Sequence, residues 1–177
     1  MSFNSIIESL IVLQFLSIKM KFHLIDRVDE IVPGKSAKGV KCVSLTNEIF
    51  DDHFPEYPVY PGSLMVESMA QLGGFLVEIS RNKSEVDLRR AILIQIEKAK
   101  FHHACIPGDQ IIIECRISST LEEAAAVESI AMVNSKIVAT ANLHFSLRKI
   151  DINRIHEERQ RLYQLWTRHL KTSLPLL

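Results

Sequence analysis

The 177-residue chain is poor in glycine and cysteine, and both shortages exclude classes of functional site. Its six glycines form neither a GxGxxG pattern nor a P-loop, so the two common nucleotide-binding turns are missing. Its three cysteines are odd in number and no two are spaced as CxxC, which argues against a disulfide framework and a zinc ribbon. Unpaired thiols of this kind favour a reducing, cytoplasmic location.

The chain also lacks an excess of charge of either sign. Lysine and arginine total 21, aspartate and glutamate total 21, and the formal net charge is zero. A nucleic-acid-binding domain usually carries a basic excess, so this partner is not expected. With 47% hydrophobic and 24% charged residues, the composition is that of one globular domain.

The longest apolar run, residues 5–18, is too short to cross a membrane, which takes about 20 residues. Glu8 interrupts the run, and the basic start of a signal peptide is missing. We therefore expect a helix here that packs on the protein or at an interface, with no stable membrane span.

Hydrophobic periodicity predicts the remaining elements. Residues 121–133 are rich in alanine and glutamate, which favour a helix, but the short turns on either side favour a strand, which we adopt. One long helix among antiparallel strands indicates the α+β class. We expect a domain over residues 1–150 and an amphipathic helical extension over 151–177. The predicted elements are strands at 21–31, 36–46, 91–101, 110–119, 121–133 and 136–149, and helices at 62–79 and 151–171.

A proline-rich loop, DDHFPEYPVYPG, leads directly into the long predicted helix. Proline fixes φ and lacks an N–H, so this segment is a stiff, shaped loop. It holds His53 just ahead of the helix, whose first residue, Gly62, offers a free backbone N–H. Such an N–H could polarise a carbonyl oxygen placed there.

The helix at 62–79 is apolar over most of its circumference, apart from one narrow stripe. Two interpretations of this stripe are open. In the first, it is the solvent face of an amphipathic helix. In the second, it places Glu67 in a polar channel within an apolar site, where a carboxyl can act as a general acid. The nearby His53 favours the second interpretation, because the two side chains would make an acid/base pair. The stripe contains Glu67, Gln71, Gly74 and Glu78.

The stretch from Asn47 to Gln71, NEIFDDHFPEYPVYPGSLMVESMAQ, resembles the β-hydroxyacyl-acyl carrier protein dehydratases of the FabZ type, whose pattern is HFPGxPVxPGxLxxExxAQ. LIDRV at 24–28 and PGDQ at 107–110 extend the resemblance over roughly residues 20–148. The related dehydratase/isomerase FabA has aspartate at the position of Glu67, so glutamate favours the plain dehydratase. Glu56 in place of glycine, SIKMKFH in place of PHRYPF, and the long tail depart from the pattern and leave the exact substrate and pathway open.

This resemblance implies the hotdog fold, in which an antiparallel sheet wraps around one long helix. It also implies that two subunits build each site. His53 of one chain would be the general base and Glu67 of the other the general acid, while the N–H of Gly62 binds the thioester carbonyl. Supporting roles would fall to Gln71, Phe54 and Pro55.

The implied reaction is dehydration of 3-hydroxyacyl-acyl carrier protein to the trans-2-enoyl form in fatty-acid biosynthesis, without a metal or organic cofactor. The implied assembly is a homodimer, and assemblies of three dimers are common in the family. The partner would be acyl carrier protein, which is strongly acidic and carries the acyl chain on phosphopantetheine. Candidates for its docking patch are Lys98, Lys100, Arg81, Arg89 and Arg90.

Two alternatives remain open: a hotdog thioesterase, and a non-catalytic acyl-binding relative of the dehydratases. The pair of His53 and Glu67 argues against both. A metal site at His103 and Cys105 is not expected, because two ligands do not make a site.

Overall fold

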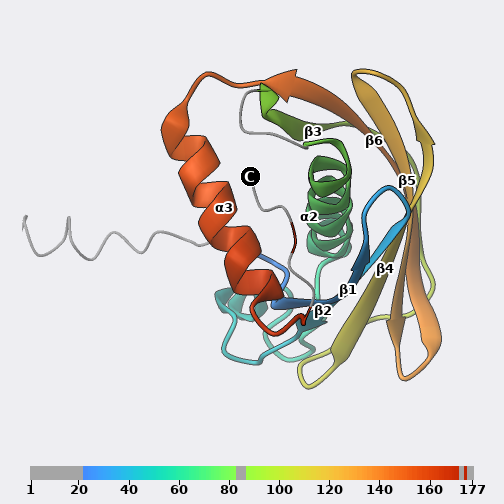
Figure 1. Cartoon of the computed structure of the whole chain (residues 1–177). Coiled ribbons are helices and arrows are strands. Elements are labelled where there is room, and N and C mark those ends of the chain that lie inside the picture. Colours follow the sequence, from blue (N-terminus) through green and yellow to red (C-terminus); the bar gives the residue numbers. More distant parts are fainter. Residues whose placement is uncertain (1–21, 83–86, 172–173, 175–177) are drawn as a thin grey trace, which may run out of the picture.

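The computed structural model describes residues 22–82, 87–171 and 174 (Figure 1). The helix expected at residues 5–18 lies outside the described residues. Among the described residues, no helix is both long and apolar enough to cross a membrane. The elements are the strands β1 (Arg27–Val32), β2 (Ser36–Cys42), β3 (Arg89–Phe101), β4 (Gln110–Thr120), β5 (Ala124–Val133) and β6 (Lys136–Lys149), the 3-10 helix η1 (Glu48–Asp51), and the helices α2 (Gly62–Arg81) and α3 (Asn153–Thr167).

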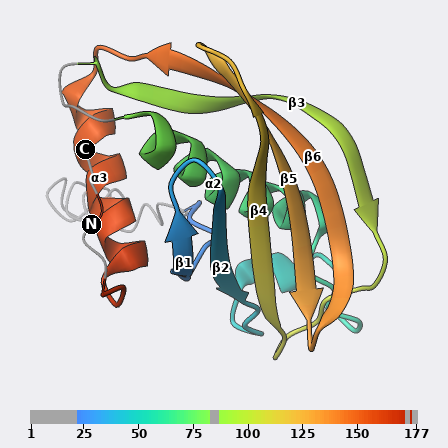
Figure 2. The same cartoon turned by 45° about the vertical axis from the view of Figure 1, so that its right-hand side comes forward.

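The six strands form one antiparallel sheet in the order β1-β2-β4-β5-β6-β3. The sheet curves around α2, as Figures 1 and 2 show from two sides. Strands β1 and β3 are its edges, so β3 pairs only with β6. This arrangement confirms the α+β class.

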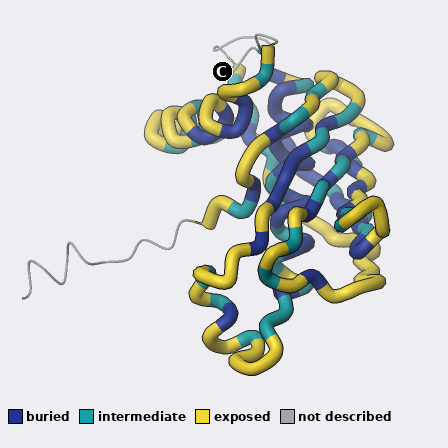
Figure 3. The backbone as a smooth tube through the Cα atoms, turned by 90° about the horizontal axis from the view of Figure 1, so that it is seen from below, coloured by how far each residue is buried: buried dark blue, intermediate teal, exposed yellow. Residues whose placement is uncertain are grey.

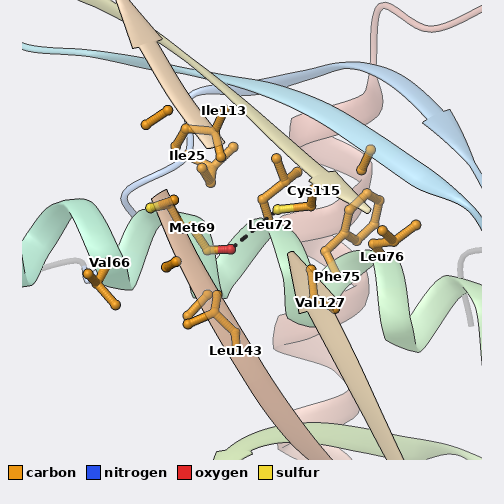
Figure 4. Close-up of a cluster of buried hydrophobic side chains, with 14 of the residues drawn as sticks. Ile25, Val66, Met69, Leu72, Phe75, Leu76, Ile113, Cys115, Val127 and Leu143 are labelled. Atoms are coloured by element: carbon orange, nitrogen blue, oxygen red, sulfur yellow. Dashed lines mark hydrogen bonds between the residues drawn. The ribbon is translucent and has the colours of Figure 1, made fainter. Parts of the chain in front are cut away.

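The core lies between α2 and the concave face of the sheet (Figure 4). Alternate residues of each central strand point inward, as expected for a sheet with one buried face. They meet the apolar side of α2, where Met69, Leu72, Phe75 and Leu76 are each 0% exposed. The strand residues labelled in Figure 4 are Ile113, Cys115, Val127 and Leu143.

Helix α3 covers the side of α2 that faces away from the sheet, so α2 is enclosed between two layers (Figures 1 and 2). An aromatic cluster joins the two helices. The Phe75 ring of α2 lies 4.5 Å from the Tyr163 ring and 5.8 Å from the Trp166 ring, measured between centroids. The outward side of α3 is exposed and the inward side buried (Figure 3), which explains its amphipathic sequence.

A buried polar network also holds α3 against α2. Glu78 of α2 is 1% exposed, and its carboxylate accepts hydrogen bonds from the Arg90 guanidinium and the Tyr163 hydroxyl, each at 2.8 Å, and from the Ala91 N–H at 3.0 Å. Arg90 also donates to Nδ1 of His156, at 2.7 Å from Nη2. Because the charge of Glu78 is paired and its oxygens are bonded, the group is stable in the interior.

The predicted strands are present, with shifted ends. Strand β1 begins at Arg27 rather than 21, and residues 22–26 belong to no helix or strand. Strand β2 ends at Cys42 rather than 46, where Ser44 and Asn47 form a hydrogen-bonded turn. The strand predicted at 121–133 is confirmed as β5, despite its alanine and glutamate content.

Candidate active site

Glu67 lies on the second turn of α2 and faces a cavity of about 710 Å³. The cavity is bounded by α2, by residues 22 and 23, and by the inward face of α3. Its lining mixes apolar and charged groups: Phe22, His23, Glu67, Gln71, Ile155, Glu158, Arg159, Arg161, Leu162, Leu165 and Trp166. This size is within the range of small-molecule sites.

Gln71, one turn after Glu67, fixes one oxygen of that carboxylate. Its amide nitrogen donates to Oε1 of Glu67 at 2.9 Å and to the carbonyl of Phe22 at 3.0 Å. Its own oxygen accepts the N–H of Leu24 at 2.9 Å. Both ends of the Gln71 amide are thus engaged, which sets its orientation and holds Glu67 toward the cavity.

His53 stands on the proline-rich loop between η1 and α2. Its Nδ1 lies 2.8 Å from the carbonyl oxygen of Val59. A carbonyl can only accept, so Nδ1 carries the proton in the neutral ring and Nε2 is left as the free base. The exposed Phe54 ring stacks on the imidazole at 4.3 Å between centroids, and the peptide bond between the two residues is cis. The loop therefore presents a histidine in a defined tautomer and orientation.

Gly62 begins α2 and lines a second cavity of about 340 Å³, together with Tyr60, Met65, Phe101 and Cys105 among others. A Cβ atom at Gly62 would lie 2.9 Å from the Phe101 ring, so a larger residue fits here only if that exposed ring moves. As the first helical residue, Gly62 has an N–H without a partner inside the helix. An acceptor placed beside it could use that group.

The thiol at Cys105 in this second cavity is not a nucleophile. Burial raises its pKa to about 11, so it is protonated at neutral pH. Burial likewise raises the pKa of Tyr60, whose hydroxyl is hydrogen-bonded to Ser68 at 3.2 Å.

The chain brings only some of the expected site residues together. Glu67 and Gln71 share the first cavity and Gly62 lines the second, whereas His53 lines neither. Phe54 contacts His53, and Pro55 is exposed on the same loop. Within one copy of the chain, His53 and Glu67 therefore line no common cavity among those described.

The structure excludes the solvent-face interpretation of the α2 stripe and one of the candidates for the docking patch. The polar stripe of α2 is not a solvent face, because Gly74 and Glu78 are buried and Glu78 is covered by α3. For the same reason this half of the stripe cannot face a dimer partner. Arg90 cannot belong to a docking patch, since it is 2% exposed and paired with Glu78.

The sequence did not reveal that α3 contributes to the Glu67 cavity. The periodicity of residues 151–171 places Leu162 and Trp166 on one face, but no local signal says which surface that face covers. Arg159, which lines the same cavity, was also missed. Burial lowers the pKa of Arg159, but Tyr163 and the carboxylates of Glu78 and Glu67 outweigh burial and raise it overall.

Comparisons with known proteins identify the family of the chain. Residues 16–142 match the model of the FabA-like domain. A 3-hydroxyacyl-acyl-carrier-protein dehydratase FabZ from Lawsonia intracellularis is 41% identical over 132 residues, covering 75% of this chain and 86% of the relative. The protein of the same name from Teredinibacter turnerae is 34% identical over 130 residues, covering 73% and 89%.

Solved structures show the same fold at low sequence identity. The dehydratase heterocomplex ApeI:P from Xenorhabdus doucetiae superposes with a TM-score of 0.61 at 15% identity, covering 74% of this chain and 86% of that one. A hot-dog-like protein from Thermanaerovibrio acidaminovorans gives 0.56 at 14%, covering 72% and 93%. The hotdog fold implied by the resemblance is confirmed, and the chain belongs to the FabA-like family, with the FabZ dehydratases among its relatives.

Proposed function

We propose that this chain removes water from 3-hydroxyacyl-acyl carrier protein to give the trans-2-enoyl thioester, as the names of its FabZ relatives state for them. The observation that carries the proposal is that the chain holds a histidine suited to act as a base and a glutamate suited to act as an acid, each fixed by a hydrogen bond. His53 has Nε2 free because Nδ1 is bound to Val59, and Glu67 is held by Gln71 at the wall of a cavity. A base and an acid held in this way suit an elimination of water.

In the proposed reaction, Nε2 of His53 takes the proton from C2, and the electrons of the C–H bond form the C2=C3 double bond. The C3–O bond breaks, and the departing hydroxyl takes the proton of Glu67 and leaves as water. The imidazolium and the carboxylate then return to their starting states by exchanging protons with solvent. No oxidant or cofactor is needed for this balance.

The backbone N–H of Gly62 is the proposed donor to the thioester carbonyl. Loss of the C2 proton places negative charge on that carbonyl oxygen, and a preorganised donor at a helix N-terminus stabilises such charge. Phe101 packs against Gly62 and limits the space in which the thioester can lie.

We propose that the complete site forms between two copies, because one chain keeps His53 and Glu67 apart. The free edge of β3 supports this assembly: the strand has no second neighbour among the described residues, and it carries Ile92, Ile94 and Ile96, which are 43%, 60% and 48% exposed. A long apolar edge strand favours pairing with another strand. Light scattering should give at least twice the 20.2 kDa chain mass, and a trimer of dimers would give six times.

Acyl carrier protein is the proposed carrier of the substrate. Lys98 and Lys100 are exposed on the end of β3 nearest Phe101, and Arg81 is exposed at the end of α2. Arg89 is half-buried and already paired with Asp87 and Glu123. The two lysines are therefore the better candidates for contact with an acidic carrier.

The test is turnover of 3-hydroxyacyl-acyl carrier protein, followed by the ultraviolet absorbance of the conjugated product. His53→Ala and Glu67→Gln should each lower kcat by about 10²–10⁴-fold while the proteins stay folded. Full dehydratase activity in either variant would contradict the proposal. Release of free carrier without an enoyl product would instead identify a thioesterase, and no turnover of any substrate would favour the acyl-binding alternative.

A further inference from the structure

The wall of the Glu67 cavity includes a part of the chain that the family match does not reach. The match ends at residue 142, whereas α3 begins at Asn153. Four apolar side chains of α3 nevertheless line the same cavity as Glu67 and Gln71: Ile155, Leu162, Leu165 and Trp166. The C-terminal extension is thus part of the pocket around the proposed acid.

Helix α3 is a rigid wall rather than a loose cover. Trp166 and Tyr163 are each 1% exposed and pack on Phe75, while the Tyr163 hydroxyl bonds the buried Glu78. Burial and the neighbouring Glu78 carboxylate raise the pKa of Tyr163, so it keeps the proton that it donates. The spacing between α2 and α3, and with it the shape of the cavity, is therefore fixed by the fold.

The apolar lining is incompletely covered. Leu165 is 52% exposed and Phe22 is 48% exposed, although both are large apolar side chains facing the cavity. Arg159 and Arg161 of α3 also line the cavity, and the aliphatic stem of an arginine can add apolar surface while its guanidinium stays in a polar environment. An occupant with a long apolar chain would remove this surface from water.

We propose that the acyl chain of the substrate, from C4 onward, runs along α3, and that Leu165 is a specificity-determining residue for chain length. This inference rests on the proposed function, because Glu67 must meet the C3 hydroxyl. With C3 held beside Glu67, the rest of the chain must leave the reacting atoms, and the adjoining cavity is lined by α3. The ligand class is a 3-hydroxyacyl thioester with an unbranched chain longer than four carbons.

Leu165→Asp tests the proposal, because an exposed residue can change without disturbing the core. Each methylene kept out of water contributes about fourfold to binding. We expect kcat/KM for a twelve-carbon substrate to fall about tenfold in Leu165→Asp and about threefold in Leu165→Ala, with that for a four-carbon substrate unchanged. The matched control is Gln164→Asp, an exposed neighbour on the same helix that does not line the cavity.

Trp166 provides a direct reading of occupancy, because it is the only tryptophan and it lines the cavity. Saturated acyl-pantetheine of twelve carbons should change its emission, and the four-carbon form should not. The unliganded emission of each variant also shows whether α3 is still docked. Equal losses for both chain lengths in a docked Leu165 variant, or no emission change with any chain, would overturn the inference.

These outcomes are separable from the proposed function. If the wild-type protein dehydrates the four-carbon substrate but Leu165 variants show no chain-length effect, the dehydratase assignment stands and the role of α3 is wrong. If Trp166 senses the twelve-carbon chain but nothing is dehydrated, the binding site stands and the proposed function is wrong.

Discussion

A mixture of two inactive variants is the sharpest test of a site shared between copies. His53→Ala removes the proposed base and Glu67→Gln removes the proposed acid, and neither change touches the core, since both residues are only half-buried. Each variant alone should lose about 10²–10⁴-fold in kcat, because every one of its sites lacks one group.

The expected recovery follows from the symmetry of a dimer. With random assortment of equal amounts, half of the dimers contain one copy of each variant. In such a mixed dimer one site joins the intact His53 to the intact Glu67, and the other site lacks both groups. One quarter of all sites is then complete, so the mixture should recover about a quarter of the wild-type rate.

The assay requires co-expression with two different tags and sequential purification on both, which isolates mixed dimers with an expected activity of about half the wild-type rate. The control is a mixed dimer of His53→Ala with the double variant His53→Ala/Glu67→Gln, in which no complete site exists. Mixed dimers that contain both single variants but remain inactive would refute the shared site.

Three further predictions follow from described contacts. Arg90→Ala leaves the buried Glu78 carboxylate without its counter-ion and should lower the free energy of unfolding, measured by urea titration, by about 3–5 kcal/mol. A loss under about 1 kcal/mol would contradict the role given to the ion pair of Arg90 and Glu78. Gly62→Ala places a methyl group 2.9 Å from the Phe101 ring and should lower kcat/KM at least about tenfold by displacing the substrate. A second substitution in the same chain, Phe101→Leu, should recover part of this loss. An unchanged kcat/KM in Gly62→Ala would argue against the contact. Only the exposed Cys42 should react as a thiol in the folded protein, because burial raises the pKa of Cys105 to about 11 and that of Cys115 to about 12. An aromatic disulfide reagent at pH 8 should therefore label one thiol of the folded protein and three after unfolding. Labelling of more than one thiol in the folded protein would show that burial does not protect Cys105 and Cys115.

The sheet and α2 were predictable from the sequence because their signals are local. Alternation marked β2 and β6. The strand at 124–133 was a harder case, since propensity alone favours a helix. There, pairing with β4 and β6 on both sides decided the outcome, which is a tertiary effect.

The burial of Glu78 could not be predicted, because the residues that cover and bind it lie elsewhere in the chain. Its stripe was correctly placed on α2, but whether a stripe faces water depends on what covers it. The covering groups come from Arg90 on β3 and Tyr163 on α3, 12 and 85 positions away. The separation of His53 from Glu67 within one chain is likewise a property of the folded loop, not of their spacing in the sequence.

The hydrogen bond from Tyr163 to Glu78 links a buried carboxylate of α2 to the C-terminal helix α3. If the chain ended after β6, the Glu78 carboxylate would keep Arg90 and the Ala91 N–H but would lose the Tyr163 donor and the helix that covers it. Among hotdog sequences, we therefore expect an acid eleven residues after the proposed catalytic glutamate to occur together with a tyrosine in a C-terminal helix wherever this contact is made. The positions of Glu78 and Tyr163 would then change together in an alignment of the family, and this covariation could be sought from sequences alone.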